Sequence, residues 1–214
     1  MAKIKIALAK GRLARKSFEL FNELGIYRYP FDNETRKLIF ADEDVEIVLV
    51  KAGDVPTYVE RGAVDIGIVG KDTLLQEQAD IYEIMDLGFG KCKMSVAAPA
   101  GFERKKDKKL RVASKYTKIA KDYYFSKNEQ VDIIYLSGSV ELAPIVGLSD
   151  VIVDIVQTGA TLKENGLEVI EDICSVSARF VANKVSFKTK SKKIKEIIDK
   201  LQKYLEKEDK NENN

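Results

Sequence analysis

The stretch SDVIVDIVQTGATLKENG, residues 149–166, decides how the rest of this chain is interpreted. Its first half, residues 151–156, is apolar and largely β-branched apart from Asp154. A short run of this kind predicts a buried strand in a parallel or mixed sheet. The fold class that follows is α/β, with this strand at the centre of a sheet.

A turn of small residues, Thr158–Thr161, follows this strand and leads into a helix predicted over residues 162–165, which Gly166 ends. Gly159 can adopt a positive φ, so the turn can direct several backbone N–H groups at one spot, which suits a phosphate. Asp154 adds an acceptor that ribose hydroxyls would need and a phosphate would not. The pattern indicates a sugar-phosphate site, and the alternative is an ordinary strand, turn and helix of an α/β core.

The composition is that of a globular protein, with no overall charge that would favour binding to nucleic acids or membranes. The 214 residues are 45% hydrophobic and 33% charged, enough for a core in one or two domains. Because 36 basic residues face 34 acidic ones, the net charge of +2 indicates neither nucleic acid nor membrane as a partner. Lysines interrupt the first apolar run, so we expect no signal peptide or membrane span. Cys92 and Cys174 have no metal-site spacing and are expected to be reduced thiols of a cytoplasmic protein.

The sequence contains no histidine. This excludes histidine acid–base catalysis, the Ser-His-Asp and Cys-His triads and the usual zinc sites. Carboxylates, lysine, arginine, backbone dipoles and a hard metal ion remain. Transfer from a pyrophosphate-activated sugar fits that set, because positioning and charge neutralisation supply most of its catalysis.

The first half of the chain places cations where predicted strands end. A strand over residues 4–8 leads to Lys10 and Arg12, which make a plausible polyphosphate clamp, with ordinary surface residues as the alternative. A second strand, residues 45–50, ends at Lys51, a candidate phosphate or base contact. Asp54 is expected to be structural, as the N-cap of the next helix. Strands and helices alternate here, so this half predicts an α/β layer around a parallel sheet.

The second half repeats the alternation after two strands without a helix between them, residues 82–98. We interpret that change as the crossing into a second domain. The turn at Ser137–Glu141 begins a helix that ends near Gly147. Glu141 is predicted either to complete a capping box at this helix or to contact a ligand.

Residues 169–187 are rich in β-type residues and return the chain to the first domain. Apolar residues at helical spacing predict a docked amphipathic helix over residues 194–205, followed by a frayed polar tail over residues 206–214. The expected domains are residues 1–90 with 175–214, and residues 91–174. Ligands of such proteins bind in the cleft at the carboxyl ends of the strands.

Four segments in order and in register closely resemble the ATP phosphoribosyltransferases, which open histidine biosynthesis. The likeness runs from about Ile4 to Phe187. The segments are KGRL at 10–13, DVPTYV at 54–59 continuing to GIVGKD at 67–72, SGSVE at 137–141, and the loop of residues 151–161. The resemblance implies the two-lobed, type II fold of the periplasmic binding proteins. It also implies transfer of a phosphoribosyl group from phosphoribosyl pyrophosphate to N1 of ATP, with Mg²⁺ as cofactor.

The resemblance assigns roles to particular residues. The 5-phosphate of phosphoribosyl pyrophosphate would be held by Thr158, Gly159, Ala160 and Thr161, and the ribose hydroxyls by Asp154. The ATP contacts implied are Lys10, Gly11, Arg12, Leu13, Ser139 and Glu141. The catalytic residues implied are Lys10, Arg12, Lys51 and Glu141, although arginine is expected to be common at the position of Lys51. The metal ligands are not identified.

The chain resembles the short form of the family, which lacks a C-terminal regulatory domain. A regulatory subunit related to histidyl-tRNA synthetase is therefore the expected partner, in a hetero-octamer that also contains further copies of this chain. Two alternatives are weighed against this function. One is a type I phosphoribosyltransferase that acts on a free base, since the loop resembles that family too. The other is a non-catalytic two-lobed solute-binding protein.

Overall fold

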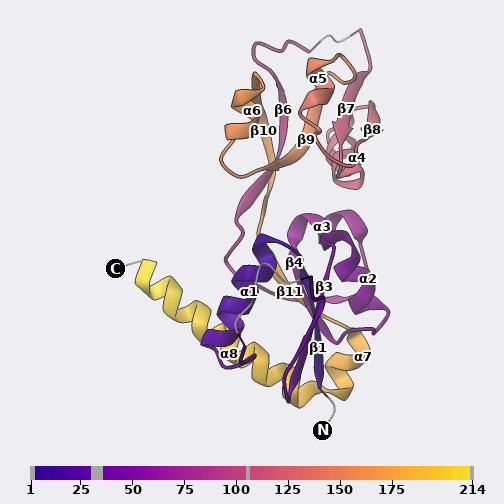
Figure 1. Ribbon diagram of the computed structural model, residues 1–214. Helices are drawn as coiled ribbons and strands as arrows, with labels where there is room; N and C mark the ends of the chain where they lie inside the picture. Colours follow the sequence, from indigo (N-terminus) through magenta and orange to yellow (C-terminus); the bar gives the residue numbers. More distant parts are fainter. Residues whose placement is uncertain (1–2, 30–35, 105–106, 213–214) are drawn as a thin grey trace. The chain divides into compact units, whose positions relative to one another are not determined.

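The computed structural model describes residues 3–29, 36–104 and 107–212 (Figure 1). The chain forms two compact units. The first unit is Met1–Gly90 with Ser177–Asn214, and the second is Lys91–Val176. The sequence-based division places the return crossing at residue 175, two residues before the start of the last segment. Each unit is a mixed α/β layer around its own sheet.

The first unit contains a six-stranded sheet of order β2-β3-β1-β4-β11-β5. β1 runs parallel to β3 and β4, so the expected parallel arrangement is confirmed for these three strands. β2, β11 and β5 are antiparallel to their neighbours. The strands are β1 Ile4–Ala9, β2 Ile39–Ala41, β3 Val45–Val50, β4 Ile66–Gly70, β5 Tyr82–Asp86 and β11 Ala178–Ala182.

Helices cover both faces of this sheet (Figure 1). α1 (Arg12–Glu23) and α8 (Ser191–Glu212) pack on the face that carries Ile6 and Leu8, and α2 (Val55–Glu60) packs on the face of Ala7. The two faces follow from the alternation of side chains along β1. The remaining helical segments of this unit are η1 Ala52–Asp54, α3 Lys71–Glu77 and α7 Lys184–Thr189.

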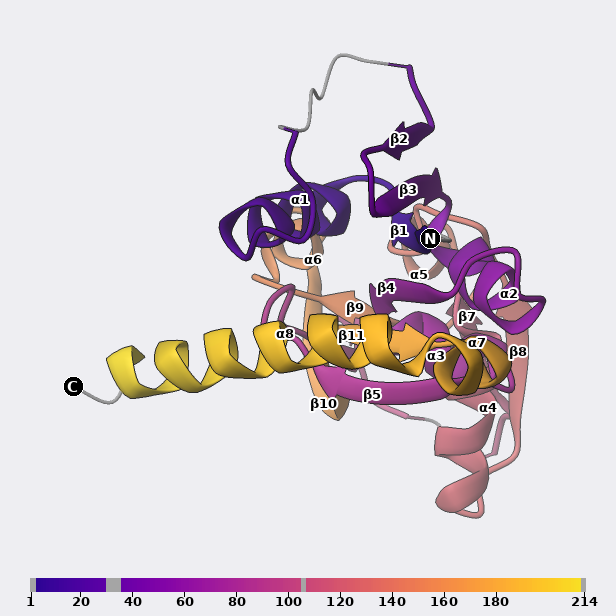
Figure 2. The same ribbon diagram turned by 90° about the horizontal axis from the view of Figure 1, so that it is seen from below.

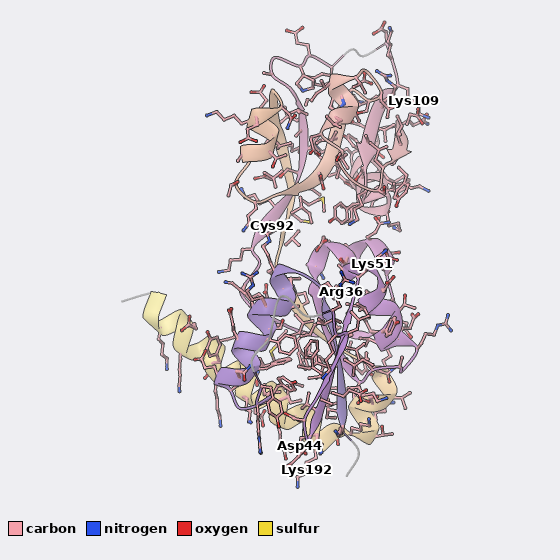
Figure 3. The ribbon with its side chains drawn as sticks, viewed as in Figure 1. Arg36, Asp44, Lys51, Cys92, Lys109 and Lys192 are labelled. Atoms are coloured by element: carbon pink, nitrogen blue, oxygen red, sulfur yellow. The ribbon has the colours of Figure 1, made fainter. Side chains whose placement is uncertain are left out.

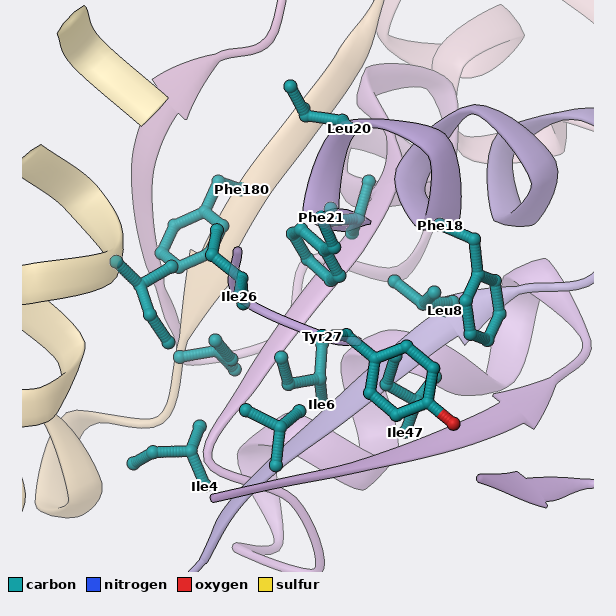
Figure 4. Packing of buried hydrophobic residues seen from close by; sticks show 14 of the residues in the cluster. Ile4, Ile6, Leu8, Phe18, Leu20, Phe21, Ile26, Tyr27, Ile47 and Phe180 are labelled. Atoms are coloured by element: carbon teal, nitrogen blue, oxygen red, sulfur yellow. The ribbon is translucent and has the colours of Figure 1, made fainter. Parts of the chain in front are cut away.

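The larger apolar cluster lies under α1 and α8 (Figure 4). Phe18 of α1 makes edge contacts with the rings of Tyr27 and Phe40, at centroid distances of 5.6 and 5.4 Å. Phe18 and Phe21 are almost completely buried. Each such side chain contributes roughly 1.5–3 kcal/mol of burial free energy. This cluster therefore fixes the helix that follows β1.

The C-terminal helix confirms the predicted amphipathic pattern and corrects the predicted tail. Ile194, Ile197 and Leu201 are buried against the first unit's core. The helix continues to Glu212 instead of fraying after residue 205, and residues 213–214 lie outside the described part. Figure 2 shows its last turns projecting past the sheet toward the end marked C.

The strand pattern expected through residue 187 is wrong at its end. Residues 184–189 form α7, because Asn183 caps this helix. The Asn183 side chain accepts hydrogen bonds from the amides of Val185 and Ser186, at 3.0 and 2.9 Å. Val185 and Phe187 inside α7 concealed this helix start, since local capping outweighs their preference for strands.

A buried carboxylate joins the ends of the first unit. Asp65 is 4% exposed and accepts hydrogen bonds from the Lys5 amide at 2.9 Å and the Ser186 hydroxyl at 2.7 Å. The Lys190 ammonium lies 2.7 Å from the same carboxylate. These contacts connect β1 to the last two helices.

The second unit contains a five-stranded sheet of order β10-β6-β9-β7-β8. β7 runs parallel to both β8 and β9, whereas β6 is antiparallel to β9 and β10. The predicted buried strand of a mixed sheet is therefore confirmed as β9. The elements are β6 Cys92–Pro99, β7 Leu110–Ser114, β8 Val131–Tyr135, β9 Val151–Val156, β10 Leu167–Val176, α4 Thr117–Ser126, α5 Leu142–Ile145 and α6 Ala160–Glu164.

Candidate active site

In the first unit, the predicted basic residues meet at one edge of the sheet. Ala9 and Val50 are paired at the ends of the parallel strands β1 and β3. The Lys10 amide donates a hydrogen bond to the Val50 carbonyl at 2.9 Å, so Lys10 and Lys51 leave neighbouring strands side by side. Figure 3 shows Lys51 and Asp44 at opposite ends of β3, with Lys51 at the carboxyl end.

At this edge, the chain leaves two neighbouring parallel strands toward opposite faces of the sheet. The helix after β1 packs on one face of the sheet, and the helix after β3 packs on the other. Two neighbouring parallel strands whose following helices cover opposite faces leave a crevice at their carboxyl ends, where ligands of α/β sheets bind. Lys10, Arg12 and Lys51 therefore follow the carboxyl ends of β1 and β3, the edge that this rule favours for a ligand.

The local structure at Gly11 explains how Arg12 reaches that edge. Gly11 has φ of +98° and is the N-cap of α1, so the chain turns from β1 into the helix within two residues. Leu13, one residue further, is half-buried and packs against the clusters on both sheet faces. In this unit Leu13 has a packing role, and a role in binding ATP stays a prediction.

Asp54 is at the predicted N-cap position of α2, but its side chain makes no capping hydrogen bond. Residues 52–54 form the short 3₁₀ helix η1, and the Asp54 amide donates to the Lys51 carbonyl at 3.0 Å. This places Asp54 in helical backbone geometry, in which a side chain does not reach the amides ahead of it. The cap expected from sequence is replaced by the preceding turn.

In the second unit, the predicted phosphate loop follows β9. Gly159 has φ of +74°, the left-handed conformation that the sequence predicted for this turn. Thr158, Ala160 and Thr161 are exposed, and the buried Leu162 anchors the short helix beneath them. Because α6 begins at Ala160, the amides of its first turn have no acceptor within the helix. The Ala160 amide donates to the Thr158 hydroxyl at 3.4 Å, and the turn otherwise presents backbone donors and the exposed side chains of Thr158 and Thr161.

Asp154 lies on β9, half-buried, two residues before the strand ends. Its carboxylate accepts a hydrogen bond from the Ile155 amide at 2.8 Å. Alternation along the strand puts Asp154 on the same face as Ile152, which belongs to the cluster under α5 and α6. The carboxylate is therefore on the face from which the phosphate loop continues.

The turn after β8 carries Ser139 and Glu141. Ser139 has φ of +47°, uncommon for a residue with a side chain, and its carbonyl accepts from the Leu142 amide at 3.2 Å. Glu141 is the N-cap of α5 and makes no capping hydrogen bond, so the capping box considered from sequence is wrong. The half-buried Glu141 carboxylate thus has no structural role as a cap.

The two predicted binding segments of the second unit, the Ser139 turn and the Thr158 loop, lie at the same edge of the sheet but are not adjacent. β7 lies between β8 and β9, so the Ser139 turn and the Thr158 loop are two strand spacings apart, about 10 Å. The loop after β7 lies between them. Sequence analysis assigned no role to it, since the strand order that brings it there is not visible along the chain.

Arg111 holds this sheet in register from the opposite end. Its guanidinium donates to the Asp150 carboxylate at 2.7 and 3.2 Å and to the carbonyl of Gly147 at 2.8 Å. These hydrogen bonds lower the pKa of Asp150 below its ordinary value. The start of β9 is thereby tied to β7 and to the segment after α5.

The second unit also has a cavity of about 330 Å³ beneath α4. Tyr124 lines it together with Val96 and Val151, none of which is a predicted site residue. Burial raises the pKa of the Tyr124 phenol, which therefore stays neutral near pH 7. Two ion pairs also line it, Arg104 with Glu129 and Lys127 with Glu171, so these charged groups are partnered within the protein.

Two further observations limit the chemistry. Over residues 3–29, 36–104 and 107–212, no three His, Cys, Asp or Glu side chains gather into a metal-binding group. In the same residues, no helix combines the length and apolarity needed to cross a membrane. A divalent ion at either edge would need ligands from a substrate as well as from the protein.

Together these features define a class: a two-lobed α/β protein whose predicted phosphate-site residues lie at the carboxyl edges of its sheets. Comparison with known proteins identifies the family. Residues 51–203 match the family model described as ATP phosphoribosyltransferase. An ATP phosphoribosyltransferase of Lachnospira eligens is 55% identical over 212 residues, covering 96% of this chain and 98% of the relative. The chain belongs to the ATP phosphoribosyltransferase family.

Solved structures agree with this assignment. A chain of the ATP phosphoribosyl transferase (HisG:HisZ) complex from Thermotoga maritima superposes with a TM-score of 0.83 and 37% identity, covering 95% of this chain and 98% of that one. The periplasmic aliphatic sulphonate binding protein SsuA from Escherichia coli gives a TM-score of 0.61 at 15% identity, covering 94% of this chain and 68% of that one. The second likeness concerns the fold and confirms the expected type II architecture.

Proposed function

We propose that this chain is the catalytic subunit of an ATP phosphoribosyltransferase. It transfers the phosphoribosyl group of phosphoribosyl pyrophosphate to N1 of ATP and releases pyrophosphate, the first step of histidine biosynthesis. The observation that carries the proposal is the relationship to ATP phosphoribosyltransferases at 55% identity over 96% of the chain. The two binding edges fit the two phosphorylated substrates of that reaction.

The second unit would bind phosphoribosyl pyrophosphate. The exposed turn of residues 158–161 offers backbone donors and the hydroxyls of Thr158 and Thr161 to the 5-phosphate. Asp154, on the face from which that turn continues, would accept hydrogen bonds from the ribose hydroxyls. A ligand that consisted of phosphate alone would have no hydroxyl group to donate a hydrogen bond to this carboxylate.

The first unit would supply positive charge for polyphosphate. Lys10 and Lys51 leave adjacent strand ends, and Arg12 begins the helix that follows. These groups would neutralise the triphosphate of ATP and the departing pyrophosphate. Glu141 and Ser139, in the turn after β8 of the second unit, would contact the nucleotide or the sugar.

The reaction needs no general base from the protein. The lone pair of adenine N1 forms the bond to C1 of the ribose while the bond from C1 to the pyrophosphate oxygen breaks, and the electron pair leaves with pyrophosphate. Adenine N1 attacks as a neutral nitrogen, which agrees with a sequence that contains no histidine. Positioning of the two substrates and neutralisation of the leaving group would supply the rate enhancement.

Mg²⁺ is part of the proposal. Magnesium commonly binds through substrate phosphates and water with one or two protein carboxylates, so a dedicated protein cage is not required. Asp154 and Glu141 are the predicted site carboxylates that could contribute at the edge of the second unit. The metal would supply neutralisation of charge on the leaving pyrophosphate.

The proposal includes partners and a location. The Thermotoga maritima neighbour was solved as a HisG:HisZ complex, which supports a regulatory subunit for this chain, in a hetero-octamer with several copies of each. A cytoplasmic location follows from the use of ATP as a substrate.

The two competing functions explain less of the chain. A type I phosphoribosyltransferase would account for the phosphate loop, but not for relatives that align over 96% of the chain. A solute-binding protein shares the fold at 15% identity and leaves the family match over residues 51–203 unexplained.

The proposal is tested by a product screen. The purified chain, with and without a candidate regulatory subunit, is mixed with Mg²⁺ and phosphoribosyl pyrophosphate and, separately, with ATP, adenine, hypoxanthine or orotate. Mass spectrometry should detect a phosphoribosyl adduct on ATP only. An adduct on a free base would transfer the chain to the type I class. Release of pyrophosphate without any adduct would contradict the transfer itself.

A further inference from the structure

The edge of the second unit's sheet has a third loop, which begins at Lys115 directly after β7. β7 lies between β8 and β9, and its last residue, Ser114, is paired with Tyr135 on one side and Val153 on the other. Lys115 therefore follows β7 at the level of Asp154, the next residue along β9. This loop stands between the two turns already assigned to substrate.

Buried hydrogen bonds hold this loop in place. The Ser114 side chain is completely buried, and its hydroxyl donates to the Val153 carbonyl at 2.6 Å. The same hydroxyl accepts from the Tyr116 amide at 2.8 Å, and the Ser114 carbonyl accepts from the Leu136 amide at 3.1 Å. One residue thus connects the start of the loop to both neighbouring strands, so the position of Lys115 is set by the sheet.

The Lys115 side chain is exposed and rests beside a buried aromatic ring. Its ammonium lies 5.8 Å from the ring centroid of Tyr116, which is 8% exposed. Within the described residues, no carboxylate lies within ion-pair distance of this ammonium, whereas Lys118, one turn further, pairs with Asp122. Lys115 therefore keeps its charge available to a ligand while Tyr116 restrains its stem.

The helices that follow β7 and its two neighbouring strands also pack on opposite faces of the sheet. α5 and α6, after β8 and β9, pack with Ile152 and Ala113 on one face of the sheet. α4, after β7, carries Tyr124, which lines the cavity formed with Val96 and Val151 on the other face. The carboxyl end of β7 is therefore a switch point of this sheet, where ligands of α/β sheets bind.

From these observations we infer that Lys115 is a further substrate-binding residue that contacts the pyrophosphate group. The inference rests on the proposed phosphoribosyl transfer. Phosphoribosyl pyrophosphate carries two anionic ends, and within the second unit the loop at residues 158–161 accounts for the 5-phosphate only; the pyrophosphate is so far assigned only to cations of the first unit. With Asp154 on the ribose hydroxyls, the ammonium beside it receives the group attached to C1. As the C1–oxygen bond breaks, Lys115 neutralises the charge that develops on pyrophosphate.

The test compares two ligands that differ in the pyrophosphate. Binding of phosphoribosyl pyrophosphate and of ribose 5-phosphate is measured by calorimetry, in Mg²⁺, for the full-length wild type and for Lys115→Gln, Lys115→Arg and Lys121→Gln. Lys121 is exposed on α4, the helix that follows the Lys115 loop, so its substitution removes the same charge outside the loop. Loss of one charge-assisted contact should weaken binding about 10- to 100-fold.

The expected result is that Lys115→Gln weakens phosphoribosyl pyrophosphate binding by that factor and leaves ribose 5-phosphate binding unchanged. Lys115→Arg should retain most of the affinity, and Lys121→Gln should match the wild type. Equal weakening of both ligands, no weakening of either, or the same loss in Lys121→Gln would overturn the assignment of Lys115. A wild type that binds neither ligand would instead contradict the proposed function, so the two failures are distinguishable.

Discussion

Replacing Gly159 with alanine should separate binding of phosphoribosyl pyrophosphate from folding. Gly159 has φ of +74°, where a residue with a Cβ costs about 1–2 kcal/mol. A Cβ built there has one protein atom within 4 Å, Cγ1 of Val156 at 3.9 Å, so no clash adds to that cost. Reduced chain entropy of the unfolded state returns roughly 0.5 kcal/mol. The net loss should be about 1 kcal/mol.

For a chain of this length, that loss corresponds to a decrease in melting temperature of about 2–4 °C. The effect on binding should be larger. The added methyl group occupies the open space over the turn, where the 5-phosphate would approach the backbone amides. Losing one charge-assisted hydrogen bond to phosphate weakens binding about 10- to 100-fold.

Gly166 provides the matched control for this substitution. It lies after the other end of α6 with φ of +70°, and a Cβ built on it meets no atom within 4 Å. Gly166→Ala should therefore lower the melting temperature by a similar amount and leave ligand binding intact. The assays are thermal unfolding by circular dichroism and calorimetry with phosphoribosyl pyrophosphate. Equal loss of affinity in both variants, or wild-type affinity in Gly159→Ala, would refute the role of the turn.

Three further substitutions test other parts of the structure. Thr161→Val keeps the shape of an exposed side chain but removes its hydroxyl, so affinity for phosphoribosyl pyrophosphate should fall about 10-fold at an unchanged melting temperature. Asp65→Ala should cost about 2–4 kcal/mol in urea unfolding, because the Lys5 amide and the Ser186 hydroxyl lose their acceptor, at roughly 1–3 kcal/mol for each buried unsatisfied group; a loss below about 1 kcal/mol would contradict this. Arg111 lowers the pKa of Asp150, so this pair stabilises the fold above the ordinary aspartate pKa. Its contribution is lost as pH falls through the lowered pKa, and the stability advantage of wild type over Asp150→Asn should shrink as the pH falls below about 4; a pH-independent difference would refute it.

Local sequence signals predicted the elements that carry the site. The β-branched run at residues 151–156 predicted β9, and the need for positive φ in the next turn identified Gly159, as the structure confirms. Lys10 and Lys51 were predicted to lie at strand ends, and the parallel pairing of β1 with β3 brings those ends together. Each of these features depends on a few consecutive residues, so they are readable from the chain.

What the sequence missed depends on contacts between distant segments. Lys115 gained no assignment because its position between two substrate turns follows from the order of strands in the sheet. The helix at residues 184–189 was missed because the cap supplied by Asn183 outweighs the strand preference of Val185 and Phe187. At Asp54 the preceding turn replaces a cap that propensity favoured. Tertiary arrangement decides each of these cases.

The most direct test of the central claim is to identify the bond that the chain forms. ATP labelled with ¹⁵N at N1 is incubated with the chain, Mg²⁺ and phosphoribosyl pyrophosphate labelled with ¹³C at C1 of the ribose. The account predicts a one-bond ¹³C–¹⁵N coupling in the product, and one pyrophosphate released for each adduct. Pyrophosphate released without that coupling, or a ¹³C label attached to any other atom, would contradict it.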